Sequence, residues 1–561
     1  MSLSHLSIHP SDYQVAISDD FLAGLRDDYA ARRIESGTAR FECHLAQMES
    51  FDSTQRNAAA FLGHLAQWVE MGFGNAALLK DMLCRFPKNS ATTLPLCDYV
   101  HLRMARGLVH MADEEFDQAI SCLEIASALE NQVGFQDLVA ICHYWIAKCL
   151  RRLYRFDDAL RHIIKGQELA LTLGQQKMVA VMRVLESWLV FKKGKPKEAT
   201  RILREAEAVL FETDDFTILG NIQSAYGRIA RREGRYDAAL AHIEKAVDEF
   251  KRRTPPPYRH LAGSLTNMAF LKQLIALQLQ NKMDQRVARR RRNHEQVDHR
   301  TATNKSLERS RISRLREEAQ QHLAEAEQMY ADANDNRGIG TVHLNRAQVL
   351  LDSGELDAAE SEAHKAYQLG LKKNDYLLLA RARILESLVE NAKFEEQIED
   401  RSDPSQHARQ ASQLAREACE WAQRTPNGRL LARALIAEGL IFSNDFFNDV
   451  EAARQCAERA TMFLRTVGHD YLWEDLQALK DRVHHVGGID SILREWSRGD
   501  VGDKTFREIT EEFAGIVIPK VWKNEGYKIS RVAFRLSISP KKVRRILSSH
   551  GMLDKKSRTV R

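Results

Sequence analysis

A spacing of 40 residues that recurs along the chain constrains the fold more than any other feature of the sequence. Within the segment "LRMARGLVHMADEEFDQAISCLEIASAL", small and apolar residues stand at five characteristic offsets. They are Gly107, Phe116, Ala119, Leu123 and Ala126. Residues of similar kind occupy the same offsets in segments 147–166, 187–206 and 227–246, and again in segment 347–366. Consecutive units in one register argue against a chance spacing of alanines.

Each unit has the pattern of two antiparallel helices. A small residue in the first helix and two in the second allow close approach of the helix backbones. Gly194, Gly234 and Gly354 lie where a turn between the helices is expected. One pair leaves an apolar face that only a neighbouring pair can cover, so the pairs must stack. The sequence therefore predicts an all-α chain with an α-solenoid.

Other segments extend the array less regularly. We interpret "WVEMGFGNAALLKDMLCRFP" as a degenerate first repeat and "LARALIAEGLIFSNDFFNDVEAARQCAERATMFL" as a late one. A further pair is split, because "HLAGSLTNMAFLKQLIALQL" supplies its first helix and "LREEAQQHLAEAEQMY" its second, later than the register requires. The polar, basic insertion between them, at about residues 281–311, is expected to be a mobile loop. The alternative is an arm that binds phosphate groups, in addition to the basic residues at the C-terminal end.

The repeat resembles the tetratricopeptide repeat, whose usual length is ~34 residues. The additional residues fall between one unit and the next and imply longer helices. In this respect the chain is similar to the repeats of large bacterial transcription regulators of the maltose-regulator type. A solenoid of this kind commonly binds its partner on the concave face. A protein or peptide partner is therefore expected there.

Basic residues gather at the C-terminal end. The whole chain has a formal net charge of +5, but from Lys520 onward thirteen Lys and Arg stand against two acidic residues, giving +11. The preceding part therefore carries −6. An acidic body with a basic tip suggests that the tip alone contacts a polyanion.

The basic tail has the signals of two short helices. Ser530 is expected to cap a helix over "RVAFRL", whereas Ser539 and Pro540 are expected to begin a helix over "KKVRRILSSH" that Gly551 ends. Five small or apolar side chains form the expected core between these helices. They are Ala533, Leu536, Ile538, Val543 and Ile546. Two helices joined in this way are what a helix-turn-helix requires.

A basic second helix suits the major groove of DNA, where it contacts phosphates and base edges. With the core buried, its opposite face shows polar and basic side chains. We assign DNA contacts to Ser530, Arg531, Ser539, Lys541, Lys542, Arg544, Arg545 and Ser548. The alternative is an amphipathic helix pair with a solvated basic face.

The segment "GYKISRVAFRLSISPKKVRRILSSHGM" resembles the Fis-type DNA-binding domain that ends many bacterial enhancer-binding activators. The resemblance covers about residues 506–552. It implies a homodimer formed largely through the preceding helix, "TFREITEEFAGIVIPKVWKN", and a roughly palindromic double-stranded DNA site. Carried onto this sequence, it places Ser539, Lys542 and Arg545 in the groove.

Three positions depart from the family pattern. Ser537 stands where Gly is preferred, so a non-Gly residue must adopt the left-handed conformation. Pro540 replaces a residue that is often basic. Pro519 falls inside the expected dimerisation helix and is predicted to kink it.

Signatures of catalysis and export are missing from the sequence. It has no His-Glu-x-x-His or Gly-x-Ser-x-Gly motif, and "KKGKPKEATRIL" lacks the spacing of a phosphate-binding loop. The eight cysteines form no Cys-x-x-Cys pair and are expected to be buried reduced thiols. No apolar run approaches the ~18 residues of a membrane span, and the first residues lack the features of an export signal. We expect a cytoplasmic, non-enzymatic protein without metal or cofactor, associated with the nucleoid when it binds DNA.

The leading hypothesis is a bacterial transcription regulator. Its expected parts are a helical region at 1–90, the solenoid at 91–480, a linker at 481–503 and the DNA-binding domain at 504–561. The solenoid would dock a partner and the C-terminal domain would bind DNA. The first alternative is a scaffold or adaptor whose tail contacts RNA, an acidic protein or membrane lipid regardless of sequence. The second is an enzyme with a diffuse site.

Overall fold

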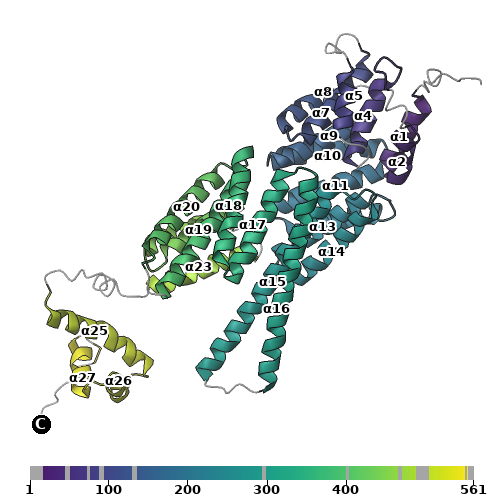
Figure 1. Cartoon of the computed structure of the whole chain (residues 1–561). Coiled ribbons are helices and arrows are strands. Elements are labelled where there is room, and N and C mark those ends of the chain that lie inside the picture. Colours follow the sequence, from purple (N-terminus) through teal and green to yellow (C-terminus); the bar gives the residue numbers. More distant parts are fainter. Residues whose placement is uncertain are drawn as a thin grey trace, which may run out of the picture.

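The computed structural model describes residues 17–44, 51–71, 76–86, 94–128, 136–293, 299–399, 403–464, 470–487, 504–549 and 552–553. Within these ranges the chain forms 24 α-helices and no strand. Most of them stack as antiparallel pairs in a tetratricopeptide-like solenoid (Figure 1). In the same ranges, no helix is long and apolar enough to cross a membrane.

Eight helix pairs form the solenoid. Their first helices are α7 (Leu96–Ala112), α9 (Gln136–Arg152), α11 (Gln176–Lys192), α13 (Phe216–Arg232), α15 (Tyr258–Asn293), α17 (Asn336–Ser353), α19 (Tyr376–Glu399) and α21 (Gly428–Phe442). Their second helices are α8 (Phe116–Ser127), α10 (Phe156–Thr172), α12 (Pro196–Leu210), α14 (Tyr236–Arg252), α16 (His299–Asp332), α18 (Leu356–Lys373), α20 (Ser405–Gln423) and α22 (Val450–Leu464).

Other helices lie before and after the pairs. At the N-terminal end they are α1 (Asp19–Ala31), α2 (Ile34–Glu42), α4 (Ala58–Glu70) and α5 (Ala76–Cys84). After the last pair come α23 (Tyr471–Gly487) and a separate group of α25 (Phe506–Asn524), α26 (Ile529–Arg535) and α27 (Pro540–Ser549). Both α4 and α5 pack against α7.

The repeat positions of the sequence lie at the helix contacts. Ala119, Ala159 and Ala239 are completely buried where the second helix meets the first. A Cβ added to Gly227 would lie 2.7 Å from Cδ1 of Ile243, so this crossing admits no larger residue without a shift. The turn glycines Gly194, Gly234 and Gly354 have φ of 82°, 72° and 81°, in the left-handed region that glycine adopts without strain. The predicted helix pairs are therefore confirmed.

The split and late pairs also form as expected. Helix α15 packs along α16, and α21 packs along α22. The pair of α19 and α20 was missed, because α19 is longer than every other first helix except α15 and no glycine marks the turn that follows it. Its signal was present in α20, where alanines three and four residues apart are buried. They are Ala408, Ala411, Ala415, Ala418 and Ala422.

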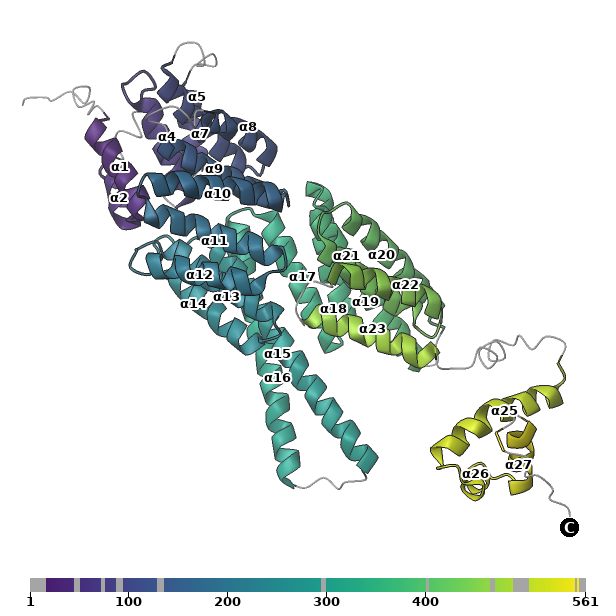
Figure 2. The ribbon, with the colours of Figure 1, turned by 180° about the vertical axis from the view of Figure 1, so that it is seen from behind.

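The expected mobile loop at about residues 281–311 is wrong for most of its length. Helix α15 continues to Asn293 and α16 begins at His299, and both views show the two helices side by side as a hairpin that projects from the stack (Figures 1 and 2). Met283 and Ile312 are buried together, and Nη1 of Arg286 lies 2.6 Å from Oε1 of Glu308. Arg, Gln and Ala are strong helix formers, so a segment without a continuous apolar stripe still extends both helices.

The first helices from α9 to α21 supply residues to one interior space, and the last helix returns to meet the middle ones. The rings of Phe270 on α15 and Tyr471 on α23 meet edge to face, with centroids 5.6 Å apart. The neighbouring Asp470 lies 2.5 Å from Arg429 and 4.0 Å from Arg232 on α13. The solenoid therefore turns far enough for α23 to contact α13 and α15.

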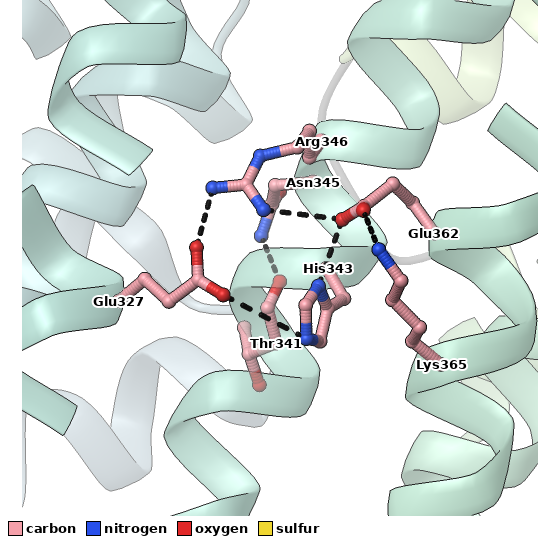
Figure 3. Close-up of polar contacts among 7 residues, drawn as sticks. All are labelled: Glu327, Thr341, His343, Asn345, Arg346, Glu362 and Lys365. Carbon is pink, nitrogen blue, oxygen red and sulfur yellow. Dashed lines mark hydrogen bonds and ion pairs between the residues drawn. The ribbon is translucent and has the colours of Figure 1, made fainter. Parts of the chain in front are cut away.

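A buried charge network joins α16, α17 and α18 (Figure 3). Nδ1 of His343 lies 2.7 Å from Glu362, whose carboxylate also accepts hydrogen bonds from Arg346 and Lys365. Arg346 reaches Glu327 on α16 at 2.6 Å. Each buried charge thus has a partner of opposite sign, as burial requires.

The cysteine prediction holds only in part. All eight are free thiols, and five of them are buried. Cys43, Cys84 and Cys97 are exposed. All three lie at helix ends: Cys43 follows α2, Cys84 is the last residue of α5 and Cys97 lies in the first turn of α7.

Candidate functional site

The three C-terminal helices pack around a small core. Thr505 begins α25 with a capping box: its hydroxyl accepts from the backbone N–H of Glu508, whose carboxylate in turn accepts from the backbone N–H of Thr505. The core itself joins all three helices. Its buried members are Ile518, Val532, Ala533, Val543, Ile546 and Leu547, and Leu536 and Ile538 pack against them. The five predicted core residues are thus all found in this cluster.

The turn between α26 and α27 has the predicted strain at Ser537. Its φ is 51°, a left-handed conformation that costs a residue with a Cβ more than it costs glycine. Oγ of Ser539 accepts a hydrogen bond from the backbone N–H of Lys542 at 3.2 Å, which confirms Ser539 as the cap of α27. Gly551, the expected end of that helix, lies outside the described residues.

The predicted cap at Ser530 is wrong. Helix α26 already begins at Ile529, and Lys528 is its capping residue without a side-chain hydrogen bond. Ser530 therefore belongs to the first turn of α26. Pro519 lies within α25, which continues on both sides of it; a kink at that position stays a prediction.

The eight residues assigned to DNA contact lie on the outside of this group. Seven of them are exposed, and Lys542 is half-buried. Ser530 and Arg531 lie on α26, Ser539 caps α27, and Lys541, Lys542, Arg544, Arg545 and Ser548 lie on α27. Nη2 of Arg545 lies 2.5 Å from Glu511 on α25. This ion pair is exposed and therefore weak, so a phosphate can replace Glu511 at small cost.

An apolar stripe on α25 was missed by the sequence interpretation. Phe506 and Phe513 are 84% and 48% exposed, and Ile509, Ile516 and Val517 are half-buried beside them. At 100° per residue these five side chains point away from the face of α25 that packs on the core. The i, i+3, i+7 spacing of Phe506, Ile509 and Phe513 was the signal that could have revealed it.

The solenoid encloses a second candidate site, a cavity of about 630 Å³. Basic side chains reach it from the last turns of α9, α11 and α13: Arg152, Lys192, Arg231 and Arg232. Others reach it from the facing segments: Arg259, Arg337, Arg381, Arg429 and Arg433. Against these nine cations the lining has three carboxylates, Glu114, Asp335 and Asp470. Sequence reasoning did not find this site, because residues from all eight helix pairs and α23 converge on it.

Several of these cations lack a carboxylate of their own. Arg152 pairs with Glu114, Arg259 with Asp335, and Arg429 with Asp470. By contrast, Lys192, Arg231, Arg381 and Arg433 form no salt bridge within the described chain. Arg231 donates to the amide oxygen of Asn267, and Arg433 to that of Gln348.

The crowding of like charges shows in the acid–base properties of the cavity. Desolvation and the charges of Arg433 and Arg231 lower the pKa of Arg381 to about 10. Desolvation and the neighbouring charges of Arg232, Arg228 and Arg231 lower the pKa of Lys192 to about 7. Desolvation is the larger cause of both shifts, and repulsion between the neighbouring cations adds to it.

Comparison with known proteins shows similarity of fold at low sequence identity. No family model matches the chain, and no curated protein matches it significantly. Among solved structures, the apo quorum sensor NprR from B. thuringiensis has a TM-score of 0.47 at 13% identity, over 71% of this chain and 97% of that one. A Rap protein complexed with competence and sporulation factor has 0.43 at 11%, over 78% and 98%. Yeast Tom70 has 0.34 at 12%, over 84% and 97%.

Proposed function

We propose that the protein is a DNA-binding transcription regulator, in which the C-terminal helices bind double-stranded DNA and the solenoid docks a protein or peptide partner. The observation that carries the proposal is the exposed basic face of α27, a helix that Ser539 caps and that packs with α25 and α26 around one core. In that arrangement α27 is the recognition helix of a Fis-type helix-turn-helix, and Lys541, Lys542 and Arg545 contact the groove and its phosphates.

Dimerisation through α25 belongs to the same proposal. The stripe of Phe506, Ile509 and Phe513 exposes apolar area that no other described helix covers. A second copy of the same helix is the partner that would cover it in a symmetric way. Two recognition helices would then read two half-sites of one DNA duplex.

The test is DNA binding by full-length protein, measured by fluorescence anisotropy on pooled genomic fragments over a series of salt concentrations. The wild-type protein is compared with Lys542→Ala/Arg545→Ala and with the control Lys504→Ala/Arg507→Ala, which removes equal charge from the start of α25. We expect a few fragments to bind tightly at physiological salt, and the α27 variant alone to lose that preference. If all fragments bind alike and dissociate together as salt rises, the tail is only an electrostatic contact.

That second outcome would favour an adaptor, in which the tail contacts any polyanion and the solenoid alone is specific. A non-enzymatic role and a cytoplasmic, nucleoid-associated location are part of the regulator proposal. The location follows from the access to chromosomal DNA that the regulator needs.

A further inference from the structure

We infer that the interior cavity of the solenoid binds an acidic peptide, with the peptide's carboxylates on the unpaired arginines. This inference deepens the partner-docking role proposed above and rests on it. Its basis is the excess of cations over carboxylates in a cavity of about 630 Å³, a size typical of ligand sites. Such an excess of like charge inside a protein is unfavourable unless a ligand of opposite charge compensates it.

The unpaired cations form a compact group. Arg231 lies close enough to Arg381 and Lys192 that its charge contributes to the lowered pKa of both, and Arg433 lines the same space. Guanidinium groups bind carboxylates through two parallel hydrogen bonds. One guanidinium nitrogen of the cavity, Nη1 of Arg429, is buried and has no hydrogen-bond partner in the described chain. A ligand with several carboxylates can therefore satisfy several of these groups at once.

Carboxamides between the cations favour a peptide over a purely anionic ligand. Asn267, Asn345, Gln348 and Asn427 line the cavity. Asn267 and Gln348 use both ends of the amide in hydrogen bonds within the chain, whereas Oδ1 of Asn345 and Nδ2 of Asn427 form none in the described chain and supply an acceptor and a donor. A peptide backbone presents alternating N–H and C=O groups, which such side chains can pair, whereas a polyphosphate has acceptors only. The mixture of arginines and carboxamides thus matches a backbone that carries acidic side chains.

The shape of the site also favours an extended ligand. A second depression of about 560 Å³ shares Glu114, Arg259, Asp335 and Arg337 with the cavity and continues it towards the turns at Asn334 and Asn374. Tyr154 and Tyr376 provide aromatic surface there. An extended chain can lie along both spaces, while a compact small anion would occupy only the first.

The experiment uses full-length protein and two pools of fluorescein-labelled octapeptides, one with Asp or Glu at half of its positions and one with Lys or Arg there. We expect the acidic pool to bind at least about tenfold more tightly at about 150 mM salt. Arg231→Gln/Arg381→Gln should weaken the binding of the acidic pool at least about tenfold. The control Arg161→Gln/Arg201→Gln removes equal charge from exposed positions on α10 and α12 and should change nothing.

Thermal unfolding of each variant establishes that the solenoid is intact. Equal binding of both pools, or full affinity in the cavity variant, would overturn the inference. Sodium tripolyphosphate and a nucleoside triphosphate are tested as alternative ligands of the wild-type protein and of Arg231→Gln/Arg381→Gln. If the wild type alone binds them and does not bind the acidic pool, the ligand is a phosphate and the peptide assignment is wrong. If the wild-type protein binds DNA but does not bind the acidic pool, this inference alone is rejected; if it binds the acidic pool but no DNA fragment, the regulator is rejected.

Discussion

Arg32 and Asp215 form a buried ion pair between residues 183 positions apart in the sequence. Their side chains are 7% and 4% exposed, and Nε of Arg32 donates to Oδ2 of Asp215 at 2.9 Å. The other oxygen of Asp215 accepts from the backbone N–H of Ile218 and so caps α13. One carboxylate therefore anchors the turn between α1 and α2 to the fourth helix pair.

Asp215→Ala is expected to lower the free energy of unfolding by about 3–5 kcal/mol, because it leaves the Arg32 guanidinium buried without a counter-charge and removes a helix cap. Urea unfolding followed by circular dichroism measures the change. The matched control is Arg56→Ala, which breaks an ion pair with Asp19 whose side chains are 79% and 66% exposed and should cost no more than about 1 kcal/mol. Similar losses in both variants would contradict the assigned role of Asp215.

The network of Figure 3 should make stability depend on pH through Glu362. Burial alone would raise the pKa of Glu362, but hydrogen bonds from His343 and Lys365 outweigh it and lower the pKa to about 2, below the ordinary value of 4.5. Since the folded-state pKa is depressed, the stabilisation is present above about pH 4.5 and is lost as the pH falls towards 2.

Glu362→Gln is therefore expected to be less stable than the wild type by about 2 kcal/mol at pH 7, and this difference should shrink between pH 4.5 and 2. Urea titrations over that pH range provide the measurement. Glu308→Gln, which breaks an ion pair with the exposed Arg286, should change stability by less than about 1 kcal/mol. A difference for Glu362→Gln that is constant down to pH 2 would show that its ionisation does not support the fold.

Two glycines in first helices should respond in opposite ways to alanine. At Gly227 a Cβ would meet Cδ1 of Ile243 at 2.7 Å and the backbone oxygen of Ala239 at 3.2 Å, so Gly227→Ala should destabilise the solenoid. At Gly263 the nearest atom is Oη of Tyr330 at 3.6 Å, so Gly263→Ala should stabilise it through helix propensity by up to about 1 kcal/mol. Chemical unfolding of both variants checks the signs, and equal shifts would rule out a tight crossing at Gly227.

The apolar stripe on α25 should control the oligomeric state. Phe506→Ser/Phe513→Ser is expected to convert a dimer to a monomer, because it removes the two most exposed aromatic rings of the stripe. Multi-angle light scattering of the full chain measures the mass. Phe534→Ser is the control, since Phe534 is 90% exposed but lies on α26. A wild-type protein that is monomeric at every concentration would exclude this mode of dimerisation.

Binding of the acidic peptide pool should strengthen as the pH falls from 8 to 6. Lys192 has a pKa of about 7, depressed by desolvation and by Arg232, Arg228, Arg231 and Arg429, so it gains its charge within this interval. We expect a two- to tenfold change in affinity, about what one added charge in such a site contributes.

Lys192→Arg should abolish this pH dependence, because an arginine there stays charged throughout the interval. The neighbouring Lys193→Arg should leave it intact, since Lys193 does not line the cavity and pairs with Asp157. Fluorescence anisotropy across the pH series distinguishes the two. A response that persists in Lys192→Arg would assign the titration to another group.

Local spacing sufficed to predict the helix pairs, because residues such as Ala119 and Gly227 meet their partners within one repeat. It also sufficed for the core of the C-terminal group, where Val543 and Ile546 face Ala533 across a short turn. The cavity could not be predicted in this way, since Arg231 and Arg381 come together only through the turn of the whole superhelix. The helical extension at residues 281–311 was misjudged because apolar periodicity was given more weight than the helix propensity of arginine and glutamine.

The contact between Phe270 and Tyr471 gives the solenoid a mechanical property that an open array lacks. In an open array each unit senses only its neighbours, so a disturbance fades along the stack. Here the first residue of α23 is held against the middle of the array, and Asp470 beside it also lines the cavity. Any ligand that displaces Tyr471 from Phe270 must release or rotate α23 as a rigid rod of about 25 Å. Helix α23 thus runs as one element from the cavity lining beside Asp470 to Gly487.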